Sequence, residues 1–324
     1  MSVKERIVEL LEANKGQYLS GEKIASYLAV SRAAVWKAIK SLQEEGYVIE
    51  AAPNKGYLLS ESSDVLSAIA MARFLSDDAK NLLIKVQKSL ESTNSTAKKE
   101  AVASAVAGTV IISEEQTAGR GRLGRSFFSP SRRGIYMSMI LRPQMQAEEA
   151  MLLTTIAAVA VAEAIESVCD KKARIKWVND IYVDEKKVCG ILTEAAFDIE
   201  SSSLQYVVVG IGINVFEPEQ GYPQELKDIA TALFAADAGD KRNQLAAEVL
   251  NRFMSYYANF AEKEFVSEYQ RRSLVIGRRI MVIYGKNTYP AVAVSIDDDC
   301  HLHVRLDDGS EKILSSGEIS IRIA

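Results

Sequence analysis

The residues 20–56 read SGEKIASYLAVSRAAVWKAIKSLQEEGYVIEAAPNKG, and they decide the fold of the first part of the chain. Ser20 and Ser31 are residue types that cap helix N-termini, and each precedes an apolar pattern of helical period. The pattern predicts helices over 21–28 and 32–44, joined by a turn of three residues. Two short helices at such a separation form a helix-turn-helix.

The flanking sequence completes this unit. Residues 3–13 carry apolar side chains at helical spacing, which predicts a third helix. Residues 47–59 alternate around the turn 53–56, which predicts a β-hairpin wing. In a winged helix-turn-helix the second helix and the wing meet DNA, and the residues placed there are Ser31, Arg32, Ala33, Trp36, Lys37, Lys40 and Lys55.

The charge of this unit is weak. Over residues 1–60, eight lysines and arginines stand against seven acids. Because each phosphate contact adds only about one unit to the salt dependence of binding, useful affinity for DNA requires a dimer on a two-part site. A helical packing module without DNA binding is the alternative interpretation.

Length and composition limit the number of domains, the cellular location and the kinds of site that the chain can contain. The chain has 324 residues, of which 48% are hydrophobic and 25% charged, which indicates two or three globular domains. The start carries charges throughout and no run of 18 apolar residues occurs, so we expect a cytoplasmic protein without a membrane partner. Three distant cysteines and two histidines, His301 and His303, exclude a disulfide framework, catalytic triads and histidine-rich metal sites.

Beyond a short polar linker at 61–64, strand and helix patterns mix. Strands are predicted at 82–86, 109–113, 135–141, 174–178, 181–183, 188–195 and 206–213, and helices at 95–105, about 148–168 and about 228–269. Several strand connections are hairpin-short, so the sheet is expected to be mixed and largely antiparallel. Five short strands then predict an SH3-like barrel. The expected fold is α+β and multidomain, with domains at 1–62, 63–272 and 273–324.

The most unusual stretch is QTAGRGRLGR at 116–125. It satisfies a dinucleotide-binding glycine pattern and nearly a P-loop, but no long helix can follow because Ser126 to Pro130 come next. Glycine lets backbone N–H groups approach an anion, and arginine pairs with carboxylate or phosphate oxygens. With Arg132 and Arg133 nearby, the loop indicates a phosphate-bearing ligand; RNA or DNA is the other partner it would suit.

Two further segments carry polar groups among apolar ones. In KWVND at 176–180, Asp180 could hold phosphate-bound Mg²⁺ and Lys176 could neutralise an oxygen, although the same letters also suit a hairpin turn. Lys187 lies inside an otherwise apolar strand, where a lysine is costly unless an anion meets it, which makes it a stronger candidate than Lys186.

Five segments in this order resemble biotin protein ligases: 91–94, 116–125, 176–180, 187–192 and 210–214. Together with the helix-turn-helix of 20–47, the chain is similar to the bacterial bifunctional form, a biotin ligase that also represses the biotin operon. Two departures are visible, Val178 where the family often has proline and Leu123 where a further arginine is common. Neither removes a ligand contact that the resemblance implies.

The resemblance implies that ATP activates the carboxylate of biotin as biotinyl-5′-AMP, and that biotin then passes to a lysine of a biotin carboxyl carrier domain. The residues it implies for biotin are Ser92, Thr93, Asn94, Gln116, Arg120, Gly121, Arg122 and Lys187. Those for ATP are Arg122, Arg125, Lys176, Asn179, Asp180 and Asn214, with Asp180 also for Mg²⁺. Lys187, Arg120 and Arg122 are the expected catalytic groups, and a homodimer on biotin operator DNA is the expected repressor.

Three alternatives remain at this stage. A ligand-sensing repressor without catalysis would not need Lys187, and a monofunctional ligase would lack DNA binding. A lipoate ligase or octanoyl transferase could use Cys189 as an acyl-accepting thiol. We interpret Cys189 as a packing residue, because it lies in an apolar strand without a histidine nearby.

Overall fold

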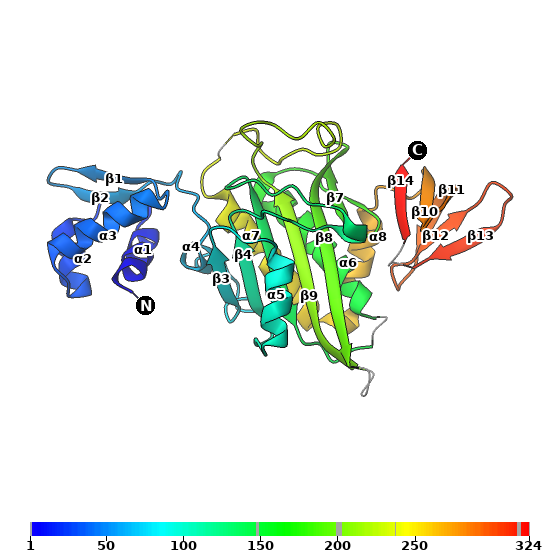
Figure 1. Ribbon diagram of the computed structural model, residues 1–324, viewed down its shortest axis with the longest axis horizontal. Coiled ribbons are helices and arrows are strands. Elements are labelled where there is room, and N and C mark those ends of the chain that lie inside the picture. Colours follow the sequence, from blue (N-terminus) through cyan, green and yellow to red (C-terminus); the bar gives the residue numbers. More distant parts are fainter. Residues whose placement is uncertain (1, 147–148, 199–202, 237, 316–318, 324) are drawn as a thin grey trace.

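The computed structural model describes residues 2–146, 149–198, 203–236, 238–315 and 319–323. Its units follow one another along the long axis of the molecule, with a small N-terminal unit and a small C-terminal sheet on opposite sides of a large central unit (Figure 1).

The N-terminal unit consists of α1 (Val3–Ala13), α2 (Gly21–Leu28), α3 (Arg32–Glu44), β1 (Ile49–Ala52) and β2 (Gly56–Leu59). As predicted, Ser20 caps α2 and Ser31 caps α3, and β1 pairs with β2 as an antiparallel wing. The apolar stripes of the three helices meet in a separate small core that includes Ile24 and Ile39. The winged helix-turn-helix expectation is therefore confirmed.

A seven-stranded sheet forms the centre of the molecule. Its strands are β3 (Leu83–Gln87), β4 (Thr109–Ser113), β5 (Gly134–Leu141), β6 (Arg174–Lys176), β7 (Asp180–Val183), β8 (Lys186–Asp198) and β9 (Ser203–Asn214). They lie in the order β3-β4-β5-β9-β8-β7-β6, and only β3 and β4 run parallel. The sheet is thus mixed and largely antiparallel, as expected from the short connections.

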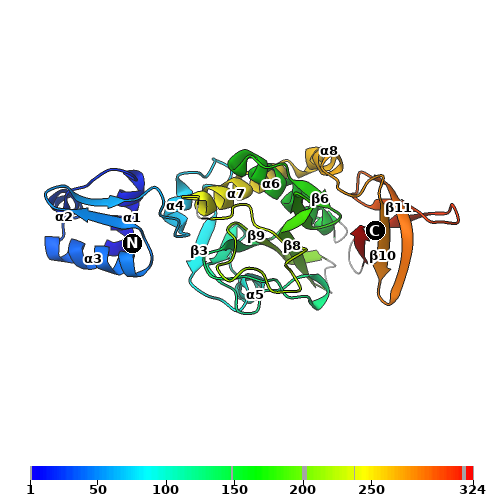
Figure 2. The ribbon, with the colours of Figure 1, turned by 90° about the horizontal axis from the view of Figure 1, so that it is seen from above.

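Helices cover both faces of this sheet. They are α4 (Ala68–Ala72), α5 (Thr93–Val102), α6 (Leu152–Cys169), α7 (Lys241–Ala258) and α8 (Glu264–Arg271). In Figure 2, α6, α7 and α8 lie on one face and α5 on the other. Among the described residues one stretch, Glu149–Cys169, is apolar and long enough to cross a membrane, but 72% of it is buried in the core. A helix that is apolar on all sides is expected at such a buried position.

Two sequence predictions in the central unit were wrong in their bounds. The helix expected from residue 95 begins at Thr93, because Ser92 caps it by accepting a hydrogen bond from the backbone N–H of Ser95. The helix expected from about residue 228 begins only at Lys241. The backbone before it pairs with strands instead, since Lys187 bridges to Ala230 and Phe216 to Phe234.

The C-terminal unit is a five-stranded antiparallel sheet of β10 (Arg279–Tyr284), β11 (Asn287–Ile296), β12 (Leu302–Arg305), β13 (Glu311–Leu314) and β14 (Ile319–Ile323). The strands match those expected for the SH3-like unit. The buried face of the sheet joins the core of the central unit, where the Trp177 indole N–H donates to the carbonyl of Cys300 at 3.0 Å.

The segment expected as a polar linker is partly buried. Ser63 is 1% exposed, and its hydroxyl accepts a hydrogen bond from the backbone N–H of Val48. Asp64 pairs with Arg242 of α7, which is 2% exposed and also binds the carboxylate of Glu114. A buried arginine between two carboxylates therefore joins the start of the central unit to α7 and to the end of β4.

Candidate functional site

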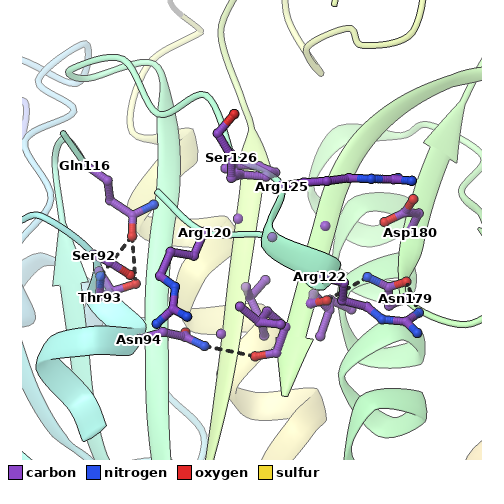
Figure 3. A pocket seen from close by; sticks show the side chains of 18 of the residues that line it. Ser92, Thr93, Asn94, Gln116, Arg120, Arg122, Arg125, Ser126, Asn179 and Asp180 are labelled. Atoms are coloured by element: carbon purple, nitrogen blue, oxygen red, sulfur yellow. Dashed lines mark hydrogen bonds between the residues drawn. The ribbon is translucent and has the colours of Figure 1, made fainter. Parts of the chain in front are cut away.

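Two adjoining cavities open above strands β8 and β9, beneath the glycine- and arginine-rich loop. Their volumes are about 110 Å³ and 650 Å³. Both are lined by a shared set: Arg122, Arg125, Ser126, Phe127, Asn179, Asp180 and Lys187. Figure 3 shows the polar side chains from α5 on one side of the site and Arg122, Asn179 and Asp180 on the other.

The narrower cavity is polar at the end formed by α5. Because Ser92 caps this helix, Ser92, Thr93 and Asn94 lie at its first turn, and all three line the cavity. The backbone N–H of Thr93 donates to Gln116 Oε1 at 2.9 Å, and Gln116 Nε2 donates to the Ser129 hydroxyl at 2.8 Å. Hydroxyl and amide groups therefore converge without a charge among them.

Asn94 is the most tightly held of these side chains. Its Nδ2 donates to Glu194 and to the carbonyl of Leu192, at 3.0 and 3.2 Å, while its Oδ1 lies 2.6 Å from the Ser138 hydroxyl. A Cβ on Gly210 would lie 1.9 Å from Asn94 Oδ1, so only glycine fits beneath this amide. The glycine pattern of β9 thus makes room for a polar group from α5.

The loop over the cavities is ordered by its own backbone. Gly121 N–H donates to the Arg125 carbonyl at 2.7 Å, and Leu123 occupies the left-handed region with φ of 55°. The Arg122 side chain extends from this turn into the site, where it donates to Asn179 Oδ1 at 3.0 Å. Burial lowers the pKa of the Arg122 guanidinium, with the Asp180 carboxylate acting in the opposite direction. An arginine stays charged under such a shift, so the loop brings a partly desolvated cation to both cavities.

Lys187 and Asp180 meet where the cavities join, with Nζ and Oδ1 2.6 Å apart. Lys187 lies on β8 and Asp180 at the start of β7, next to it in the sheet. The pair offers one cation and one carboxylate to a ligand that spans both cavities. The lysine therefore has an anionic partner, as expected for a lysine in an apolar strand.

The wider cavity is basic and aromatic. Lys176 lies over the Tyr182 ring, 5.6 Å from its centroid, and Asn214 Nδ2 donates to the Thr231 carbonyl at 3.2 Å. Tyr222 and Phe128 complete its aromatic lining. Within the described ranges, no group of three or more His, Cys, Asp or Glu residues could hold a metal. A single carboxylate, that of Asp180, is enough for a magnesium ion that phosphate oxygens also ligate.

Some residues singled out in the sequence lie elsewhere. Arg132 donates to the carbonyl of Glu45, at the end of α3, and Arg133 pairs with Glu219, so neither lines the two cavities. Cys189 is fully buried, and burial raises the pKa of its thiol well above the ordinary range. The interpretation of Cys189 as a packing residue agrees with this setting.

Three residues at the site escaped the sequence reasoning: Phe127, Ser138 and Glu194. Phe127 packs against β9, where a Cβ on Gly212 would meet its ring at 2.5 Å. Ser138 and Glu194 lie within β5 and β8. The sequence signal that could have identified Ser138 and Glu194 is a polar residue within an otherwise apolar strand.

A second candidate surface lies on the N-terminal unit. The side chains of Ser31, Arg32, Ala33, Trp36, Lys37, Lys40 and Lys55 are all exposed. A groove between α2, α3 and the wing is lined by Arg32, Ala33 and Trp36, and Trp36 is 56% exposed. A large aromatic side chain and several cations thus share one face, which suits contact with phosphates and base edges.

Comparisons with known proteins match all three units. A model of the biotin/lipoate A/B protein ligase family matches residues 86–214, an HTH domain matches 3–58, and the biotin protein ligase C-terminal domain matches 275–322. The bifunctional ligase/repressor BirA of Bacillus subtilis is 35% identical over 97% of this chain and 98% of its own. The BirA of Escherichia coli is 29% identical over 100% and 98%.

A solved structure agrees with these matches. The biotin protein ligase of Aquifex aeolicus in complex with biotin and ATP superposes with a TM-score of 0.63, at 29% identity, over 75% of this chain and 99% of that one. The chain belongs to the biotin protein ligase family, as a relative of its bifunctional ligase/repressor members over essentially its whole length.

Proposed function

We propose that this protein is a biotin–[biotin carboxyl carrier protein] ligase that uses ATP and forms AMP, and that it also represses transcription of the biotin operon. One observation carries the enzymatic part: a cavity with an uncharged polar end at α5 and a basic, aromatic cavity meet at Lys187 and Arg122. A ligand with a polar ring at one end and an anion at the other suits this arrangement.

Biotin occupies the narrower cavity. Its ureido ring lies toward Ser92, Thr93, Asn94 and Gln116, and its carboxylate points toward Lys187, with Arg120, Gly121 and Arg122 closing over it. The uncharged end suits a ureido group, which carries donors and an acceptor but no charge. The cationic end suits the carboxylate.

ATP occupies the wider cavity, where Arg122, Arg125, Lys176, Asn179, Asp180 and Asn214 surround it. Tyr182, Tyr222 and Phe128 offer apolar surfaces for the base. Asp180 would hold Mg²⁺, which would supply charge neutralisation at the phosphates.

The first step joins the two ligands. A carboxylate oxygen of biotin attacks the α-phosphorus, the bond to pyrophosphate breaks, and biotinyl-5′-AMP forms. The carboxylate is ionised near pH 7 and needs no base, but repulsion between two anions opposes its approach. Lys187, Arg120 and Arg122 reduce that repulsion electrostatically. In the second step a lysine amine of the carrier domain attacks the acyl carbon, loses a proton and releases AMP.

Repression uses the N-terminal unit. The exposed face of α3 and the wing contact operator DNA, and a homodimer places two such faces on a two-part site. Biotinyl-5′-AMP, held beneath the loop of residues 116–125, is the corepressor that favours the dimer. The functional units are residues 1–62 for DNA, 63–272 for catalysis and 273–324 for the C-terminal sheet, and the protein acts in the cytoplasm.

The enzymatic assignment is tested with Lys187→Ala. We expect biotin-dependent exchange of pyrophosphate into ATP to fall by at least about a hundredfold, because a cation is lost where two anions meet. Lys186→Ala is the matched control, since its side chain is exposed and its ammonium group donates to the carbonyl of Lys227, outside both cavities. Near-normal exchange by folded Lys187→Ala protein would contradict the assignment.

A further inference from the structure

Four polar side chains form a line of short contacts beside the narrower cavity. Thr93 Oγ1 lies 2.8 Å from Ser138 Oγ, Ser138 Oγ lies 2.6 Å from Asn94 Oδ1, and Asn94 Nδ2 lies 3.0 Å from Glu194 Oε2. Thr93 and Asn94 line the cavity itself. Glu194 lies behind Asn94 on β8, outside the lining of both cavities.

The Glu194 carboxylate determines which atoms donate and which accept hydrogen bonds along this line of contacts. Burial by itself would raise the pKa of Glu194, but hydrogen bonds from Lys98 and Asn94 and the charge of Arg120 lower it below its ordinary value. An ionised carboxylate only accepts hydrogen bonds. The NH₂ group of Asn94 must therefore face Glu194, and its oxygen must face Ser138.

The hydroxyl protons then have one consistent arrangement. Ser138 has a single proton and shares it between Asn94 Oδ1, its shorter contact, and Thr93 Oγ1. Thr93 Oγ1 donates its own proton to Gln116 Oε1 at 3.1 Å, and it accepts in its 2.8 Å contact with Ser138. The Gln116 oxygen accepts from both the backbone N–H and the hydroxyl of Thr93.

This arrangement decides what the cavity offers a ligand. Both protons of the Asn94 amide are engaged, by Glu194 and by the Leu192 carbonyl. Asn94 Oδ1 and Thr93 Oγ1 each retain a lone pair, whereas neither has a proton to spare. At Asn94 and Thr93 the cavity therefore accepts hydrogen bonds and selects ligand groups that donate them.

We propose that Glu194 is a positioning residue that orients Asn94, and through Ser138 also Thr93, so that the cavity accepts N–H groups of the ligand. The inference rests on the proposed placement of biotin, whose ureido ring carries two N–H donors. Glu194 does not touch biotin. It sets the acceptor polarity that the ureido N–H groups meet.

The first test is Glu194→Ala, assayed by biotin-dependent pyrophosphate exchange. We expect the KM for biotin to rise about tenfold or more, because a buried amide is left without its partner, while kcat and the KM for ATP stay within about threefold. The matched control is Lys98→Met, which removes the closer of the two cationic partners of Glu194 and leaves the Asn94 bond and the Arg120 pair in place. Its KM for biotin is expected to stay within about twofold of wild type.

The second test exchanges the amide and the carboxylate between positions 94 and 194. Asn94→Asp places two carboxylates together and is expected to weaken biotin binding, whereas Asn94→Asp with Glu194→Gln restores one donor and one acceptor and should recover most of the affinity. Thermal unfolding of each variant identifies loss of fold. An unchanged KM in Glu194→Ala, an equal rise in Lys98→Met, or a folded double variant without recovery would each overturn the proposal. Failure of the biotin placement itself would instead appear as an unchanged KM for biotin in Thr93→Val and Gln116→Ala.

Discussion

At the scale of single residues, Cys189 shows how position along the chain can suggest the wrong chemistry. It lies two residues after Lys187, yet its side chain points into the core and has no exposed surface. Burial raises the pKa of the thiol, with Lys187 only partly opposing that effect. A thiol that stays protonated is a poor nucleophile, so acyl transfer through Cys189 is disfavoured.

We therefore expect Cys189→Ala to retain biotin transfer to the carrier domain within about twofold of wild type. The free energy of unfolding should fall by about 1–2 kcal/mol, because a buried sulfur is replaced by a small cavity. Transfer assays and urea denaturation measure the two effects. Cys169→Ala, at the end of α6, is the control, and loss of transfer by folded Cys189→Ala protein would mean that the thiol accepts the acyl group.

Residues that are unusual for their setting could be predicted from the sequence. Lys187 lies in an otherwise apolar strand, and the arginines of 116–125 lie among glycines, so both were recognisable. Glu194 and Ser138 were not, because a polar residue in a strand is equally compatible with the exposed face of a sheet. Only the register of β5, β9 and β8 brings Ser138 and Glu194 to the same amide.

At the scale of elements, α3 follows from local rules. Ser31 caps it, its apolar stripe is buried, and its cations remain exposed. Each of these properties depends on neighbours within one or two turns, which is why the pattern predicted the bounds correctly. The helix expected from about residue 228 failed for the opposite reason, since its backbone groups find partners on distant strands.

The exposed lysines of α3 lead to a prediction about salt. Lys37→Ala should weaken operator binding at low salt and reduce the slope of log K against log [KCl] by about two units, because the dimer loses one phosphate contact in each protomer. Fluorescence anisotropy with a promoter fragment at 50–200 mM KCl measures this slope. Lys99→Ala on α5, also exposed, should leave it unchanged, and equal slopes for all three proteins would show that Lys37 does not contact phosphate.

At the scale of the whole molecule, buried charges connect the N-terminal unit to the centre. Lys15, just after α1, donates to the Asp240 carboxylate at 2.7 Å and to the Ser63 carbonyl at 2.9 Å. Arg242 pairs with Asp64 and Glu114. Arg132, which follows the loop of residues 116–125 in the sequence, donates from its guanidinium to the carbonyl of Glu45 at 2.5 Å. The composition of residues 61–64 predicts only a polar linker, because ion pairs across more than a hundred residues leave no local pattern in the sequence.

Removing the central charge should be strongly destabilising and pH-dependent. Arg242→Met leaves two buried carboxylates unpaired, so the free energy of unfolding should fall by about 3–5 kcal/mol at pH 7.5. Burial raises the pKa of Asp64 to about 6 even though Arg242 opposes the shift, and without Arg242 it rises further. The folded variant then binds protons more tightly than the unfolded chain, so its stability is lost as pH rises through that folded pKa.

Urea denaturation of wild type and Arg242→Met at pH 5.0 and 7.5 measures the effect. The difference between the two proteins should be smaller at pH 5.0, and Asp64→Asn with Glu114→Gln in the same variant should recover part of the loss at pH 7.5. A difference of equal size at both pH values would rule out the orphaned carboxylates as its cause.

The pairing of Asp64 with Arg242 also bears on where this protein can be cut. Glu114, the other partner of Arg242, directly follows β4 and precedes the loop of residues 116–125, so a fragment that begins after Asp64 would leave Arg242 with Glu114 alone and disturb the strand that leads into the loop. A shortened ligase for use as a laboratory biotinylation tool should therefore start upstream of Ser63. Without the winged helix it would bind no operator and still keep the three-residue ion cluster.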